Sequence, residues 1–156
     1  MIIIAAVTED GGLGYQGELL YHIPQDMERF RQLTMGKTIV MGRKTMESLP
    51  GKQPLSGRIN VVLTKQNELE ATGFEISHHS DQWYQKDCVV IGGAQIYEEF
   101  LPYAKRVYLT RIIGNKKADV YFPNIQKEKN LKLMHQSKRF EYENIQYWFE
   151  IYEKVN

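Results

Sequence analysis

One acidic residue has an unusual place on a predicted helix. Pro24 suits the first turn of a helix, where its missing N–H leaves no hydrogen bond unmade. On a wheel of about 100° per residue, the apolar sector holds Ile23, Met27, Phe30, Leu33 and Thr34. Asp26 falls between Phe30 and Leu33, whereas the polar side holds Gln25, Glu28, Arg29, Arg31 and Gln32. A carboxylate that faces apolar surroundings is costly unless it is paired or its pKa rises.

Two interpretations of Asp26 follow from this helix. In the first, Asp26 is a first-turn acid that the helix dipole favours and that water partly solvates. In the second, it is a buried acid that binds donor groups of a ligand or handles a proton. The helix alone leaves both open.

Glycines stand where two predicted strands meet helices. Val89–Ile91 is followed by Gly92 and Gly93 and then by a helical stretch. Glycine lets the backbone approach a ligand closely, and the N–H groups at a helix start attract phosphate. Packing alone also produces such junctions, and the Rossmann spacing with its acidic partner is missing here.

The second junction adds positive charge. Gly42, Arg43 and Lys44 follow one apolar strand, and Thr64 and Lys65 follow another. Ligands of open α/β sheets bind at the carboxyl ends of the strands. These groups are therefore candidates for a phosphate monoester site, with a solvated basic rim as the alternative. Three such strand ends together favour a phosphorylated nucleotide.

Composition limits the class of protein. The chain has 156 residues, a formal net charge of +1 and a single cysteine, Cys88. The near-zero charge gives no general attraction to nucleic acid or to an anionic membrane. One cysteine excludes an internal disulfide and cysteine-rich zinc sites, which fits a reducing cytoplasm. We expect a cytoplasmic, single-domain protein over residues 1–156, with four surface histidines and no metal site.

The apolar pattern predicts strands and helices in alternation, which is typical of an α/β fold. The predicted strands are Ile2–Val7, Thr38–Met41, Ile59–Leu63, Cys88–Ile91 and Arg106–Thr110. The predicted helices are Pro24–Thr34, Lys44–Ser48 and Ala94–Leu101. Leu131–Phe140 and Ile145–Tyr152 are expected to pair antiparallel through a tight turn. A parallel sheet with an antiparallel edge results.

Six motifs in series resemble the dihydrofolate reductase family over nearly the whole chain. They are Ile4–Ala6 with Leu13 and Gly14, Ile23–Met27 with Phe30 and Thr34, Met41–Ser48, Leu55–Arg58, Ile91–Tyr97 and Asp119–Pro123. Each motif is modest alone, but the order and spacing are specific. The resemblance implies a central, mostly parallel eight-stranded sheet with an antiparallel C-terminal strand and about four flanking helices.

The resemblance also implies the substrate, 7,8-dihydrofolate, and the residues that bind it. Asp26 would bind the pterin and promote protonation of N5 with water, with Thr110 supporting the carboxylate and Tyr21 in place of a family Trp. Arg58 would pair with the α-carboxylate of the glutamate tail. The remaining substrate contacts would come from Ile4, Ala5, Met27, Phe30, Leu49 and Ile91. Antifolate inhibitors would occupy the same site, in a monomer.

NADPH is the implied hydride donor. Arg43, Lys44, Thr64 and Lys65 would recognise its 2′-phosphate, and the Gly92–Gly93 peptide is expected to be cis. The other implied cofactor contacts are Ala6, Leu13, Gly14, Gly42, Thr45, Leu63, Ala94, Gln95, Ile96 and Tyr97.

The chain departs from the family where Leu20-Tyr21 stands for the usual Pro-Trp. Leu20 removes a φ restraint, so we expect a more mobile closing loop, loosened further by Gly11 and Gly12. Two rival functions are a reductase of the same fold that acts on a ribosylated pyrimidine in riboflavin synthesis, and a non-catalytic nucleotide-binding regulator.

Overall fold

The computed structural model describes residues 1–67, 69 and 71–155. In these residues the α-helices are α1 (Pro24–Thr34), α2 (Arg43–Ser48) and α3 (Ala94–Phe100). The expectation of about four helices is therefore wrong by one. The other helical segments in the described chain are short 3₁₀ turns, such as Leu101–Tyr103, where Pro102 interrupts the helix that Ala94 begins.

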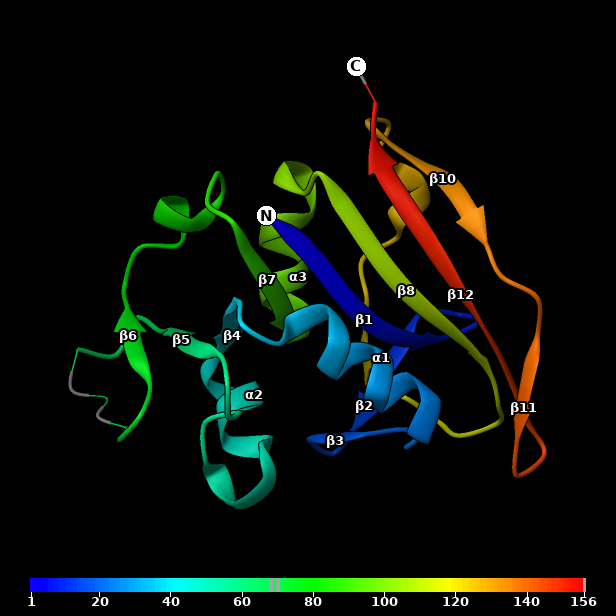
Figure 1. The fold of residues 1–156 in the computed structure, drawn as a ribbon, viewed down its shortest axis with the longest axis horizontal. Coiled ribbons are helices and arrows are strands. Elements are labelled where there is room, and N and C mark those ends of the chain that lie inside the picture. The colour runs from blue at the N-terminus through cyan, green and yellow to red at the C-terminus, as the bar shows by residue number, and fades with distance from the viewer. Residues whose placement is uncertain (68, 70, 156) are drawn as a thin grey trace.

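The strands form one large sheet and one small sheet (Figure 1). The strands are β1 (Ile2–Thr8), β2 (Gly12–Tyr15), β3 (Glu18–Leu19), β4 (Thr38–Gly42), β5 (Ile59–Leu63), β6 (Glu75–Ser77), β7 (Cys88–Gly92), β8 (Arg106–Ile113), β9 (Val120–Tyr121), β10 (Leu131–Gln136), β11 (Phe140–Tyr142) and β12 (Ile145–Lys154). The large sheet runs β10-β12-β8-β1-β7-β4-β5-β6, and β11 pairs with β12. The predicted mostly parallel sheet is confirmed along this path of eight strands, and β11 adds a ninth strand to it in the described residues.

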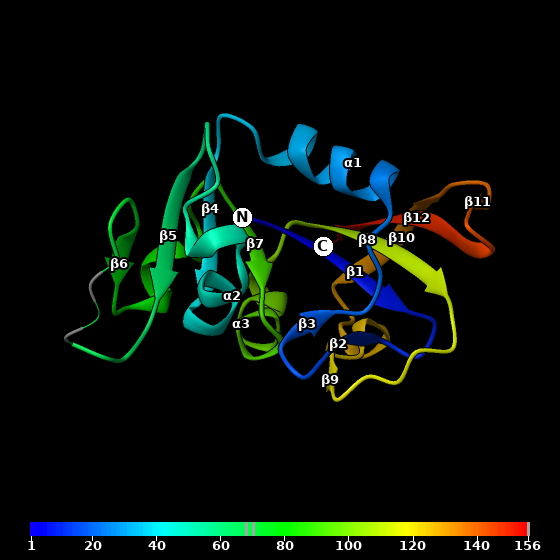
Figure 2. The same cartoon turned by 90° about the horizontal axis from the view of Figure 1, so that it is seen from below.

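Continuous apolar strands are covered on both faces. On β4, Ile39 and Met41 belong to one apolar cluster and Val40 to another, and all three side chains are fully buried. Figure 2 shows α1 on one face of the large sheet and α3 on the other. Side chains that point alternately to two buried faces are all apolar, so such a strand is an unbroken apolar run in the sequence. For this reason the buried strands could be predicted close to their observed bounds.

The C-terminal edge is antiparallel, as predicted. β12 pairs antiparallel with β8 on one side and with β10 and β11 on the other. Glu143 and Asn144 connect β11 to β12 with φ angles of 48° and 66°. Two residues with positive φ form the tight hairpin turn whose twist matches the strands. The run predicted as one strand over Leu131–Phe140 is two strands.

The small sheet has the order β3-β2-β9, and no pattern in the sequence predicted it. Its strands have two to four residues, too few for an alternating pattern to be recognised. Gly12 and Gly14 serve close packing here. A Cβ on Gly12 would lie 2.7 Å from Thr8 Oγ1, and one on Gly14 would lie 2.7 Å from the Glu18 carbonyl oxygen. Close contacts therefore account for glycine at both positions, whereas the greater mobility that we expect from Leu20, Gly11 and Gly12 stays a prediction.

A substitution of Leu109 tests whether the apolar cluster beneath the middle of the sheet stabilises the fold. The Leu109 side chain is fully buried in the apolar cluster that also contains Tyr97 and Phe100 of α3. We expect Leu109→Ala to lower the free energy of unfolding by about 2–5 kcal/mol through lost burial and a cavity. Leu133→Ala on β10, where the side chain is 45% exposed, is the control, and urea unfolding of both variants measures the difference. Equal losses would contradict the assignment of the core.

Candidate functional site

Asp26 turns from the first turn of α1 toward β8. The Thr110 hydroxyl, in the middle of the sheet, donates a hydrogen bond of 2.5 Å to Asp26 Oδ1. Thr110 is buried, and Asp26 is half-buried. The predicted contact between these residues is confirmed. It favours the second interpretation of the helix, because a purely solvated first-turn acid would not face the sheet.

Burial raises the pKa of Asp26 above its ordinary value. The hydrogen bond from Thr110 and the positive charge of Arg29 act in the opposite direction and are the smaller effects. A raised pKa means that the proton stays on this carboxyl at a higher pH than on a surface aspartate. The site therefore holds an acid suited to proton management.

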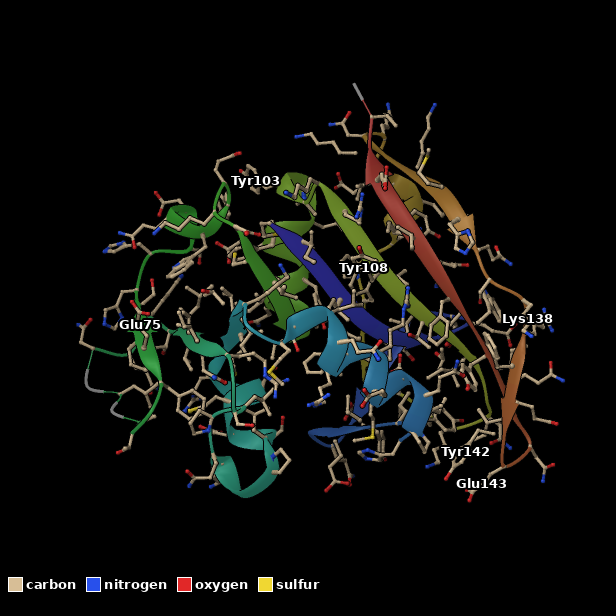
Figure 3. The ribbon with its side chains drawn as sticks, in the orientation of Figure 1. Glu75, Tyr103, Tyr108, Lys138, Tyr142 and Glu143 are labelled. Carbon is tan, nitrogen blue, oxygen red and sulfur yellow. The ribbon has the colours of Figure 1, made fainter. Side chains whose placement is uncertain are left out.

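Arg29 is not on a solvated face, and its predicted place on the polar side of α1 is wrong. Its guanidinium carbon lies 4.3 Å from the ring centroid of Phe149 and 5.4 Å from that of Tyr108. Tyr108, labelled in Figure 3, lies on β8 two residues before Thr110. Guanidinium groups pack on aromatic faces with little loss of charge interaction, so Arg29 brings a cation into the surroundings of Asp26.

A small cavity of about 50 Å³ opens beside Asp26. Predicted site residues that line it are Ala6, Leu13, Tyr21, Asp26 and Met27. Met27 is 56% exposed, so its predicted burial on the apolar sector is wrong. The first turn of α1 forms the wall of an opening, and an apolar side chain there is free to contact a ligand.

Tyr21 reaches away from the carboxylate. Its hydroxyl accepts a hydrogen bond of 2.9 Å from the backbone N–H of Lys116, in the connection between β8 and β9. Its ring packs near Ile23 and Ile112 under α1. The hydroxyl of Tyr21, which stands where the family has a Trp, is therefore directed to this connection, while the residue lines the cavity beside Asp26.

The segment before Tyr21 forms hydrogen bonds with the same connection between β8 and β9. The side chain of Asp119 accepts a hydrogen bond of 2.9 Å from the N–H of Gln16, and the Asp119 N–H donates to the Gly14 carbonyl. Gly12 and Gly14 also pair with Tyr121 and Val120 of β9. The predicted loop residues Leu13 and Gly14 therefore lie in an ordered hairpin.

The carboxyl end of β7 lies beside the first half of β1 at the next part of the site. Ile3 pairs with Val90, so Ile4 and Ile91 are neighbours, and both pack with Leu49 in one apolar cluster. The buried Tyr97 hydroxyl donates 2.7 Å to the Ile4 carbonyl. That oxygen keeps a second lone pair for a ligand. The Ala5 side chain instead lies in the core on the other face, so only its backbone can serve the site.

The Gly92–Gly93 peptide is cis, as predicted. Gly93 precedes α3 as its N-cap, and Ala94, Gln95 and Ile96 form the first turn of that helix. A Cβ on Gly42 would lie 3.1 Å from Ile96 Cγ1. The two glycine junctions therefore lie against each other and leave bare backbone at one end of the sheet.

The basic junctions also come together. Gly42 pairs with Leu63 in the register of β4 and β5, so Arg43, Lys44 and Thr45 begin beside Thr64 and Lys65. Arg43 lies 3.5 Å from Glu47, and both side chains are partly exposed. Leu63 is buried in the core and offers only its backbone. His78, one of the four surface histidines, places its Nδ1 2.8 Å from the Thr64 carbonyl oxygen, a contact that no sequence motif predicted.

Arg58 is held at the opposite end of α1 from Asp26. Its Nε donates 2.9 Å to the Ser56 carbonyl, and Nη1 donates 3.1 Å to the hydroxyl of Thr34, the last residue of the helix. Phe30 lies between the two ends on the same helix. A carboxyl and a guanidinium thus flank one face of α1.

A larger cavity, about 530 Å³, lies elsewhere, around Arg111 and Glu150. Arg111 Nε lies 2.9 Å from Glu150 Oε1, and Trp148 and Tyr152 donate to the same carboxylate at 3.0 and 2.9 Å. These groups satisfy one another's hydrogen-bonding capacity, so the cluster has a structural explanation and needs no ligand.

Across residues 1–67, 69 and 71–155, three or more potential metal ligands nowhere gather. In the same ranges, every helix is too short or too polar to cross a membrane. All four histidines are exposed, as expected.

Comparisons with known proteins agree with this geometry. The family model described as Dihydrofolate reductase matches residues 1–154. The dihydrofolate reductase of Bacillus subtilis is 36% identical, with 98% of this chain and 94% of the relative covered. That of Buchnera aphidicola is 34% identical, with 99% and 87% covered. The structure of dihydrofolate reductase from Enterococcus faecalis, complexed with NADP(H) and RAB-propyl, superposes with a TM-score of 0.89 at 28% identity, covering 99% and 96%.

The raised pKa of Asp26 predicts a stability that depends on pH. Between the ordinary pKa and the raised one, the folded chain holds a proton that the unfolded chain has lost, so stability falls as the pH rises through that window. Asp26→Asn removes the buried charge, and we expect its melting temperature at pH 7 to exceed that of the wild type by a few degrees. The difference should shrink below the ordinary aspartate pKa. Glu28→Gln, on the exposed face of α1, is the control. A melting temperature of Asp26→Asn equal to that of the wild type at pH 7 would contradict the raised pKa of Asp26.

Proposed function

The chain belongs to the dihydrofolate reductase family, and from this premise we propose which of its residues carry out the reaction. The activity is the reduction of 7,8-dihydrofolate to 5,6,7,8-tetrahydrofolate with NADPH. The observation that carries the assignment of residues is a half-buried carboxyl, Asp26, held by Thr110 in the wall of a cavity at the strand ends. Neither rival function has a use for this acid together with Arg58.

The length of α1 fits the substrate. Eight residues separate Asp26 from Thr34, a rise of about 12 Å along the helix, and Arg58 is bound to Thr34 at the far end. A pterin at Asp26 and a glutamate tail at Arg58 would lie along this helix. The rings between them would contact Met27, Phe30 and Leu49, and the carbonyls of Ile4 and Ile91 would face the pterin edge, with Ala5 in contact only through its backbone.

Asp26 is the catalytic residue in this proposal. Its two oxygens would accept hydrogen bonds from the pterin 2-amino group and N3, a planar bidentate pairing. Because burial raises its pKa, the carboxyl supports protonation of N5, through water, at a pH where a surface aspartate has lost its proton. Thr110 positions the carboxyl, and the Tyr21 ring excludes solvent on one side.

The residues present fit NADPH. Bare backbone at Gly42, Gly92 and Gly93 allows close approach of a pyrophosphate. Arg43, Lys44, Thr64 and Lys65 follow paired strands and would hold the 2′-phosphate. When bound, NADPH supplies the hydride that reduces pterin C6. The remaining contacts would come from Ala6, Leu13, Gly14, Thr45, Leu63, Ala94, Gln95, Ile96 and Tyr97. The Enterococcus faecalis relative in complex with NADP(H) supports this assignment.

We further propose that residues 1–156 form one domain that acts as a cytoplasmic monomer and binds antifolate inhibitors at the same site. One continuous sheet that runs from Ile2 to Lys154 supports the single domain. The single cysteine, Cys88, is buried and unpaired, which suits a reducing compartment.

Asp26→Asn tests the catalytic assignment. An amide keeps the shape but cannot supply the proton, so we expect turnover at neutral pH to fall at least about 100-fold. NADPH binding, measured by fluorescence titration, should stay nearly unchanged. Glu28→Gln on the same helix should retain wild-type turnover. Comparable rates of NADPH oxidation by Asp26→Asn and the wild type would refute the catalytic role of Asp26.

Arg58→Ala tests the orientation of the substrate. Loss of a charge-assisted pair with a carboxylate should raise KM for dihydrofolate by about 10- to 100-fold, while a pterin without the glutamate tail should be reduced as before. Arg31→Ala is the control, because Arg31 is exposed and lies 3.6 Å from Glu28 on the same helix. An equal effect on both substrates would count against Arg58 as the carboxylate partner.

A further inference from the structure

Lys116, in the connection from β8 to β9, contacts two consecutive residues of the wall beside Asp26. Its backbone N–H donates 2.9 Å to the Tyr21 hydroxyl, and its side-chain Nζ donates 2.9 Å to the Leu20 carbonyl. The same Nζ lies 4.9 Å from the centroid of the Tyr21 ring. One residue therefore satisfies a carbonyl, a hydroxyl and an aromatic face in the segment that leads into α1.

Gly114 makes this arrangement possible. A Cβ at this position would lie 2.0 Å from the Tyr21 hydroxyl oxygen and 2.4 Å from Cζ. Backbone of the β8–β9 connection thus lies directly against the end of the tyrosine ring. The seating of Tyr21 is specific, because any side chain at position 114 would displace either the ring or the connection.

The two residues that Lys116 contacts, Leu20 and Tyr21, are part of the proposed site. Leu20 is buried, and Leu20 and Tyr21 line the small cavity together with Asp26 and Met27. Both stand immediately before the helix that carries the catalytic carboxyl. On the other side, β8 carries Thr110, which holds Asp26, and then leads to Lys116. The strand β8 and the loop that follows it therefore contact both Asp26 and the neighbouring cavity wall formed by Leu20 and Tyr21.

We propose that Lys116 is a positioning residue for the reduction, which fixes Leu20 and Tyr21 against the pterin side of the site. This inference rests on the role proposed for Asp26. A Leu-Tyr pair lacks the rigid φ of proline, so its backbone depends on an external partner. Lys116 supplies that partner through a charged donor at Leu20 and a cation over the Tyr21 ring.

Lys116→Met is the test, because it keeps the aliphatic stem and the backbone N–H and removes only the ammonium. In single-turnover measurements with saturating NADPH, we expect the hydride-transfer rate to dihydrofolate to fall about tenfold, since small displacements of a wall reduce productive orientation strongly. KM for dihydrofolate should rise, while the dissociation constant for NADPH stays as in the wild type. Lys116→Arg, which keeps a charged donor, should restore most of the rate.

Lys117→Met is the matched control, because this neighbouring exposed lysine makes none of the three contacts and the charge change is the same. Its rate should equal that of the wild type. If Lys116→Met also matches the wild type, or only lowers the melting temperature without a change in rate, the inference is overturned. A rate that Lys116→Arg fails to restore would also overturn it. A wild-type chain without dihydrofolate turnover would instead refute the proposed function.

Discussion

The hydrogen bond from Thr110 to Asp26 joins α1 to the middle of the sheet, and the proposed site is arranged around it. It fixes the side of α1 that faces β8, and so places Met27 at the mouth of the cavity. It also sets the distance along the helix to Thr34 and Arg58, which gives the site two chemically different ends. The contact is possible because Thr110 lies in a buried strand between β1 and β12, where the backbone is fully paired.

Opposing effects act on the Asp26 carboxyl. Burial raises its pKa, while the Thr110 hydroxyl and the charge of Arg29 lower it by less. A fully apolar wall would leave the group permanently protonated, and full solvation would leave it an ordinary surface acid. Arg29 can be held near it because aromatic rings of β8 and β12 accept a guanidinium face. The Asp26 carboxyl therefore lies between these two environments, and its burial lowers the stability of the fold at a pH where the group is ionised.

The residues proposed to bind the substrate and those proposed to bind the cofactor occupy different parts of one sheet. Glycines and basic side chains stand at or directly after the ends of β4, β5 and β7, whereas β8 contacts Asp26 of α1. The connection after β8 adds a further constraint, because Asp119 holds the hairpin of β2 and β3 and Lys116 holds Leu20 and Tyr21. One loop thereby contacts both halves of the segment that borders the proposed site, which explains how a chain with Leu-Tyr before α1 keeps that segment in place.

Local features of the sequence determined the bounds of α1, the buried strands, the antiparallel edge and the side of the helix on which Asp26 lies. Periodicity and proline placement set these within a few neighbouring residues. The family motifs added the cis Gly92–Gly93 peptide. Only the tertiary structure decided the direction of the Tyr21 hydroxyl, the packing of Arg29, the exposure of Met27 and the small sheet of β2, β3 and β9. Each of these depends on partners far apart in the chain, such as Tyr21 and Lys116, which are separated by 95 residues. No local pattern encodes such a contact, because it forms only after the sheet has brought the two loops together.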